Sequence, residues 1–258
     1  MIVIRMNFFY GINNELFKSE IQIPLFQNRN LKKSNLKLFK SYPKNNKWIL
    51  QEINNEKINE YFYILKSQDI LSNEIFFLAD ESILNKFDDK KLENYNNFTD
   101  TSPAFRANLK IYLNEGGFSS YQSDYPYSMA TKRGTILSSI SSIANPVADK
   151  NYVLIRNVFE EPIEEKFRAY LVNYKTKSIE EQFEIKTNFT NCIEIDNKLI
   201  KPEIFLVTDK YLGIPMYVSV KDSFLSFEHT HPPHEYILSE NKFLKISQFK
   251  KEINELIS

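Results

Sequence analysis

The clearest pattern of hydrophobic and polar positions lies in the second half of the chain. In residues 105–113, apolar side chains occupy every second position, which is the period of a strand with one buried face. Similar short runs occur at 152–159, 165–174, 183–187, 192–195, 204–208, 215–220 and 224–231. Strands that recur about every ten residues with turn residues between them are typical of an antiparallel β-sandwich or barrel.

The end of the chain has a different period. Apolar side chains recur at intervals of three or four residues at Ile246, Phe249, Ile253, Leu256 and Ile257. This spacing predicts a C-terminal helix that packs one face on the preceding strands.

The first hundred residues combine both periods. Strand-like runs occur at 2–10, 20–26, 48–53 and 74–79, whereas 54–66 and 83–95 have helical spacing. The sequence therefore predicts an α+β protein, mostly β, with a smaller α+β part at 1–100. An antiparallel β-sandwich or barrel follows at 101–258 and is closed by the C-terminal helix. Turn residues and a proline at 96–103 mark the boundary, and one continuous domain is the alternative.

Composition limits the classes of partner. The 258 residues include 33 basic and 33 acidic side chains, and a formal net charge of zero disfavours nucleic acid and anionic membrane surfaces. No stretch approaches the ~18 uncharged apolar residues of a membrane-spanning helix, so no membrane insertion is expected. The N-terminal run contains Arg5 and lacks a small-residue cleavage site, which predicts a first strand and a cytoplasmic location.

Candidate chemistry is concentrated in residues 227–236, which contain all three histidines of the chain. Alternation along the preceding strand predicts that His229 and His231 share one face. With His234 they form a candidate ligand set for zinc, iron, manganese or nickel. Glu228 is a candidate for orienting the ligands, and His234 with Glu235 for acid–base catalysis. The alternative is that the cluster has only a structural role.

The His229-Thr230-His231 pattern resembles the His-x-His motif of cupin-type barrels, whose metal ligands project inward from strands. Pro232 and Pro233 interrupt the strand where a cupin usually continues to a glutamate, and no histidine elsewhere in the chain can provide a later ligand. The family is therefore not assigned from this motif.

A tyrosine-rich loop is predicted at 118–129 and provides a second set of candidates. Tyr121, Tyr125 and Tyr127 stand among serine, glutamine and aspartate, which suits stacking on a sugar ring or contact with a partner protein. Arg106 is a further candidate for ligand binding because guanidinium offers paired donors, and Trp48 is another aromatic candidate. The alternative is that these tyrosines only cover the edge of the sandwich.

Two main functional hypotheses follow, and the sequence does not decide whether the protein is an enzyme. The first is a metal-dependent or histidine-based site that acts on a small polar or sugar-derived molecule. The second is a non-catalytic module that binds a glycan or a partner protein through the tyrosine-rich stretch. A third alternative is a subunit of a larger assembly, and the sequence leaves the oligomeric state open.

Overall fold

The protein divides into two compact units that interleave along the chain. A computed structural model describes residues 7–24, 36–53, 57–59, 62–93, 107–114, 116–229 and 240–258. Unit 1 comprises Met1–Lys132, Val158–Glu164 and Asn188–Thr190, and unit 2 comprises Arg133–Asn157, Glu165–Thr187 and Asn191–Ser258. The boundary predicted at 100/101 lies outside the described residues and stays a prediction.

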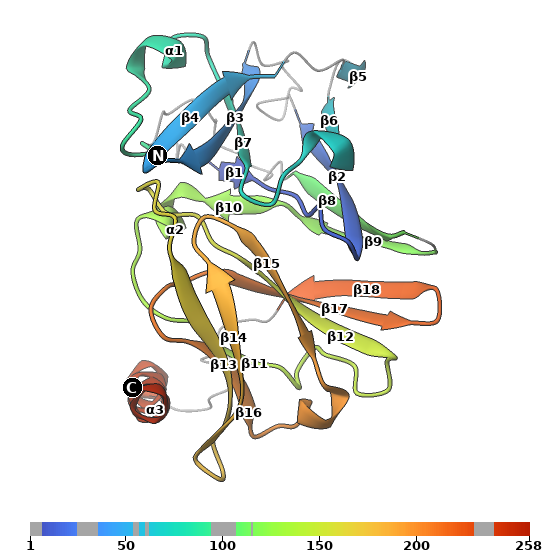
Figure 1. The fold of residues 1–258 in the computed structure, drawn as a ribbon, viewed down its shortest axis with the longest axis vertical. Helices are drawn as coiled ribbons and strands as arrows, with labels where there is room; N and C mark the ends of the chain where they lie inside the picture. Colours follow the sequence, from blue (N-terminus) through green and yellow to red (C-terminus); the bar gives the residue numbers. More distant parts are fainter. Residues whose placement is uncertain are drawn as a thin grey trace. The chain divides into compact units, whose positions relative to one another are not determined.

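Unit 1 contains two five-stranded antiparallel sheets (Figure 1). The first has the order β10 (Asp124–Pro126), β1 (Asn7–Phe9), β7 (Ile75–Ala79), β3 (Lys37–Lys44) and β4 (Lys47–Glu52). The second has the order β5 (Lys57–Asn59), β6 (Phe62–Lys66), β2 (Phe17–Pro24), β8 (Asn108–Leu113) and β9 (Phe118–Gln122). Short helical turns complete the unit: η1 (Ser67–Asp69), α1 (Ile83–Lys86) and α2 (Tyr127–Ala130).

A two-residue turn sets the register of the β3–β4 hairpin. Asn45 and Asn46 both have left-handed backbone angles, with φ of 53° and 57°. Asparagine tolerates this conformation, and two such residues form the turn that matches the twist of paired strands. The resulting register places Lys40 directly opposite Gln51 on the neighbouring strand.

The α+β prediction for the first hundred residues is wrong. Residues 54–66 contain β5 and β6 where a helix was predicted, and α1 covers only Ile83–Lys86 of the helix predicted at 83–95. The inward positions Tyr63 and Leu65 pair with Ile23 and Ile21 of β2. Aromatic and β-branched side chains at 61–64 favour a pleated surface, and tertiary pairing overrides the local helical spacing.

Unit 2 contains two four-stranded antiparallel sheets. One has the order β11 (Leu137–Ser139), β16 (Ile204–Thr208), β13 (Lys166–Asn173) and β14 (Ser178–Lys186). The other has the order β15 (Thr190–Ile195), β12 (Lys150–Arg156), β17 (Ile214–Lys221) and β18 (Phe224–His229). The turn η2 (Asn197–Leu199) follows β15.

These four small antiparallel sheets correct the prediction of a single sandwich or barrel. The strands themselves recur much as the pattern predicts, but their partners differ from a simple meander. β14 and β15 are consecutive in the chain, yet β14 pairs with β13 in one sheet and β15 belongs to another. Hydrophobic alternation has the same period in every strand, so it does not identify the sheet to which a strand belongs.

The helix expected at the C-terminus is present as α3 (Lys242–Ile257), which is seen end-on beside the sheet of β13 and β14 and contacts both strands (Figure 1). Ile253 is fully buried with Tyr170, Val172 and Val207 of that sheet. Phe249 makes edge-to-face contacts with Tyr174 and Phe205, at centroid distances of 4.6 and 5.0 Å. An apolar stripe at helical spacing thus covers one face of this sheet.

Candidate functional site

A polar pocket in unit 1 is the candidate site. It has a volume of about 520 Å³ and lies where β3 and β4 approach η1 and the turn before β7. We call it the Lys40 pocket, and its lining residues are Lys40, Gln51, Glu52, Ile53, Gln68, Asp69, Leu71 and Glu74. The cross-strand pairing of Lys40 with Gln51 brings two of these side chains to the same place.

An ion pair between a half-buried lysine and a buried glutamate forms the fixed part of this lining. Lys40 Nζ lies 2.7 Å from Glu74 Oε1, and only 2% of the Glu74 side chain is exposed. The second carboxylate oxygen, Glu74 Oε2, accepts a hydrogen bond from the Leu71 amide at 2.9 Å. Burial of a carboxylate is costly unless both oxygens find partners, and here each oxygen has one. This pair therefore holds Lys40 in one position.

The two remaining acidic side chains of the lining differ in their partners. Glu52 Oε1 lies 3.0 Å from Lys37 Nζ, and the same ammonium also contacts Glu81. These hydrogen bonds, the one to Glu81 first and the one to Glu52 second, raise the pKa of Lys37. Asp69, at the end of η1, makes no ion pair with any residue that the structure describes.

The Lys40 pocket offers amides, carboxylates and one ammonium around an apolar patch from Ile53 and Leu71. Its volume falls in the range of small-molecule sites, roughly 300–1,000 Å³. Sequence reasoning missed it because its residues come from three separate segments of the chain. One feature of the sequence could have pointed to the pocket: Glu74 is an acidic residue directly before the apolar run 75–79.

The histidine segment is only partly described. β18 alternates as predicted: Phe227 is buried and His229 half-buried, while Ser226 and Glu228 are exposed. His229 Nδ1 lies 3.0 Å from Glu228 Oε1, and β18 is an edge strand of its sheet. His231, His234 and Glu235 lie outside the described residues, so their arrangement stays a prediction.

The metal prediction also stays a prediction. Within the described ranges, no three His, Cys, Asp or Glu side chains are grouped closely enough to hold a metal ion. Two of the three predicted ligands, His231 and His234, lie outside those ranges.

The tyrosine-rich stretch is not a loop, because it forms β9, β10 and α2. Tyr125 is fully buried and pairs with Phe8 of β1, so it is a core residue. Tyr127 packs against the Phe8 ring at 6.3 Å, and its hydroxyl donates to the Leu92 carbonyl at 3.3 Å. Tyr121 is half-buried in β9. Ligand binding by Tyr121 and Tyr127 stays a prediction.

The other predicted ligand-binding residues do not join these tyrosines. Trp48 is buried, and its indole N–H donates to the Glu160 carbonyl at 2.8 Å. Arg106 lies outside the described residues.

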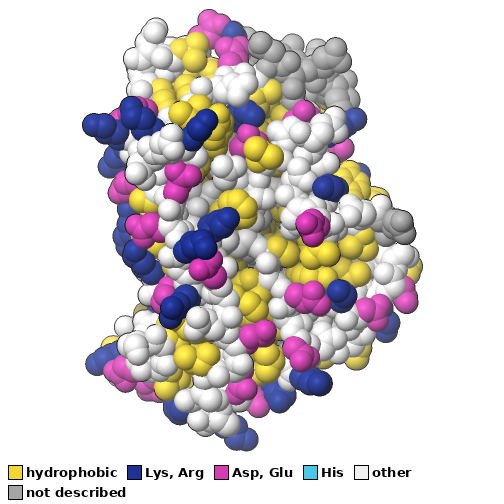
Figure 2. Space-filling model, in the orientation of Figure 1, with side chains coloured by type: hydrophobic (Ala, Val, Ile, Leu, Met, Phe, Trp, Pro, Cys, Tyr) yellow, Lys and Arg dark blue, Asp and Glu magenta, His cyan; other side chains and the backbone are white. Residues whose placement is uncertain are grey.

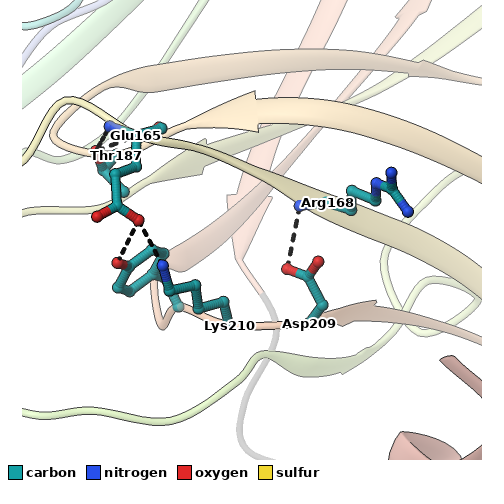
Figure 3. Close-up of polar contacts among 6 residues, drawn as sticks. Glu165, Arg168, Thr187, Asp209 and Lys210 are labelled. Atoms are coloured by element: carbon teal, nitrogen blue, oxygen red, sulfur yellow. Dashed lines mark hydrogen bonds and ion pairs between the residues drawn. The ribbon is translucent and has the colours of Figure 1, made fainter. Parts of the chain in front are cut away.

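A second polar cluster lies on the surface of unit 2 (Figure 3). Glu165 Oε2 accepts hydrogen bonds from Lys210 Nζ at 2.5 Å and from the Tyr211 hydroxyl at 2.9 Å. The bond from Lys210, and then the bond from Tyr211, lower the pKa of Glu165. Arg168 points away from this cluster, and its backbone amide donates to Asp209. These exposed contacts fasten β13 to the segment after β16, which is a structural role.

Charged side chains of both signs are interspersed over the visible face of the protein (Figure 2). The expectation that the protein does not bind nucleic acid stays a prediction. Across the described residues, no helix is both long and apolar enough to cross a membrane.

Comparison of the chain with known protein families, curated proteins and solved structures found no match. The functional argument therefore rests on the chemistry of these sites.

Proposed function

We propose that the protein binds a small polar molecule in the Lys40 pocket. The observation that carries this proposal is a concave site of about 520 Å³ built around the ion pair of half-buried Lys40 with buried Glu74. Most ligand sites are lined mainly by apolar side chains with a few polar groups that orient the ligand, whereas this lining is mainly polar with a small apolar patch. Such a lining suits a ligand that is itself rich in hydrogen-bonding groups. A sugar derivative has the size and the hydroxyl groups that such a lining accommodates.

Filling the Lys40 pocket tests this proposal. Leu71 lines the pocket and is 56% exposed, so Leu71→Trp adds bulk to the site without overpacking the core. Leu84 in α1 is 55% exposed and lies outside the lining, which makes Leu84→Trp the matched control. Saturation-transfer NMR with monosaccharides, amino sugars and amino acids should detect binding to the wild type and to Leu84→Trp. Binding should be lost in Leu71→Trp.

Two results would contradict the proposal. One is the absence of saturation transfer to any member of this panel in the wild-type protein. The other is equal binding by Leu71→Trp and the wild type. Thermal unfolding of both variants shows whether the fold is retained, so that lost binding is not confused with lost structure.

A second candidate function is metal binding by the histidine segment, and the contact between His229 and Glu228 favours it. A carboxylate on one ring nitrogen is a common way to orient an imidazole for a metal on the other. His231 and His234 would provide further ligands, and Glu235 would act with His234 in acid–base chemistry. Zinc, iron, manganese and nickel all suit this ligand set.

Elemental mass spectrometry of protein purified without a histidine tag tests the second candidate. The double variant His229→Ala/His231→Ala should lose a near-stoichiometric metal that the wild type carries. Ser226→Ala changes an exposed residue of the same strand and should retain the metal. Wild-type protein that remains metal-free after incubation with zinc, iron, manganese and nickel would exclude this function.

A further inference from the structure

We infer that the Lys40 pocket selects ligands that carry a protonated amine beside hydroxyl or amide groups. This inference rests on the proposed function and adds the charge of the ligand. It follows from the way the ionised side chains of the lining are paired.

The lining has an excess of negative charge. It contains one lysine and three acidic residues: Lys40, Glu52, Asp69 and Glu74. Lys40 and Glu74 neutralise each other at 2.7 Å, and the Leu71 amide also binds Glu74. This pair therefore contributes little net charge toward a ligand.

The other two carboxylates are less fully neutralised. Glu52 shares the ammonium of Lys37 with Glu81, so one positive charge serves two carboxylates. Asp69 makes no ion pair with a described residue. A concave site whose lining has a net negative charge attracts a cationic ligand and disfavours an anionic one.

The hydrogen-bonding groups of the Lys40 pocket fit the same kind of ligand. An ammonium offers three N–H donors and no acceptor, so it needs several oxygen acceptors around it. Glu52 and Asp69 provide carboxylate oxygens, and Gln51 and Gln68 each add an amide carbonyl. No described residue accepts a hydrogen bond from the side-chain amide N–H groups of these two glutamines, so they can donate to hydroxyl oxygens of the ligand.

A bound metal ion is the competing explanation of an acidic lining. Within the described residues, no three acidic, histidine or cysteine side chains are grouped closely enough to hold a metal ion. A pocket of about 520 Å³ has room for a molecule the size of a sugar, which favours an organic cation over a compact divalent ion.

Isothermal titration with three sugars of equal ring size tests the inference. The probes are glucosamine, glucose and glucuronate, in a mildly acidic buffer that keeps the amine protonated. We expect the wild type to bind glucosamine about fivefold more tightly than glucose, the effect of one partly exposed ion pair. Glucuronate should bind more weakly than glucose, because its carboxylate meets the excess negative charge.

Asp69→Asn removes a charge that forms no ion pair with a described residue, and it preserves the shape of the side chain. This variant should bind glucosamine about fivefold more weakly and leave glucose affinity within about twofold of the wild type. Glu15→Gln removes an exposed acidic side chain outside the Lys40 pocket and is the control, which should bind all three sugars like the wild type.

The possible failures are distinguishable. Equal affinities for glucosamine and glucose, unchanged in Asp69→Asn, would overturn the inference and leave the proposed function intact. Calcium binding that Asp69→Asn abolishes, without a preference for the amine, would overturn the inference in favour of a metal site. If none of the three sugars binds and the Leu71→Trp panel is also negative, both the inference and the proposed function fail.

Discussion

At the residue scale, Glu74 depends on Lys40. Its carboxylate is buried to 2% exposure at the start of the apolar strand β7, and its charge is balanced by a lysine from a different strand. A buried ion pair is often no more stabilising than apolar packing, but loss of one partner leaves a charge in an apolar environment. The Lys40–Glu74 pair of the pocket therefore affects the stability of the fold whether or not a ligand is bound.

Lys40→Met should therefore destabilise unit 1. We expect the free energy of unfolding to fall by about 2–3 kcal/mol, since the Glu74 carboxylate loses its counter-ion but keeps the hydrogen bond from Leu71. Urea unfolding followed by circular dichroism measures this change. Lys47→Met is the control, because Lys47 forms its ion pair with Asp89 at the exposed surface and its loss should have no measurable effect. Equal stability of the two variants would show that the Lys40–Glu74 pair contributes nothing.

Sequence reasoning identified parts of the histidine segment and none of the Lys40 pocket. The alternation of Phe227, Glu228 and His229 is a local property, and the structure confirms it. The Lys40–Glu74 pair joins residues 34 positions apart, and its register depends on which strands become neighbours. Hydrophobic periodicity contains no information about that choice, so the site was not predictable from periodicity alone.

At the element scale, α3 binds its sheet through an apolar stripe that also half-buries a lysine. Lys250 Nζ donates to the Thr135 carbonyl at 2.5 Å. Burial lowers the pKa of Lys250 below the usual 10.5. A lowered lysine pKa means that the folded state disfavours the charged form. This destabilisation has its full size at pH values below the folded-state pKa of Lys250. It disappears as the pH rises to the pKa of the unfolded state.

The free energy of unfolding of Lys250→Met should vary less with pH in the alkaline range than that of the wild type. Relative to this variant, the wild type should gain stability as the pH rises toward about 10.5, because its buried ammonium loses the proton. The difference between the two proteins isolates Lys250 from the tyrosines and lysines that titrate in the same range. Urea midpoints measured across that range test this expectation.

Lys251→Met is the matched control, since Lys251 is the exposed neighbour on the same helix. It should follow the wild type at every pH. A constant difference between the wild type and Lys250→Met across the range would contradict the role given to burial of this ammonium.

At the scale of the whole molecule, the chain passes repeatedly between the two units. Val158–Glu164 and Asn188–Thr190 belong to unit 1, although the residues on either side of each segment belong to unit 2. Asn188 joins the two segments: its side-chain amide donates to the carbonyls of Glu161 and Ile163, both at 3.0 Å, and its Oδ1 accepts from the Phe159 amide at 2.8 Å. Its own backbone is left-handed, with φ of 50°.

Two features of Asn188 favour asparagine at this position: its left-handed backbone and the hydrogen bonds of its side chain. Two substitutions distinguish their contributions to stability. Asn45 has a similar φ of 53° but is exposed in the β3–β4 turn, so Asn45→Ala should cost only the backbone term of about 1 kcal/mol. Asn188→Ala also leaves two carbonyls and one amide without their partner in a fully buried position, which should bring the loss to about 3–4 kcal/mol. Urea unfolding of both variants measures the difference. If Asn188→Ala costs no more than Asn45→Ala, the hydrogen bonds of this side chain do not hold the two segments together, and the left-handed backbone alone explains the asparagine.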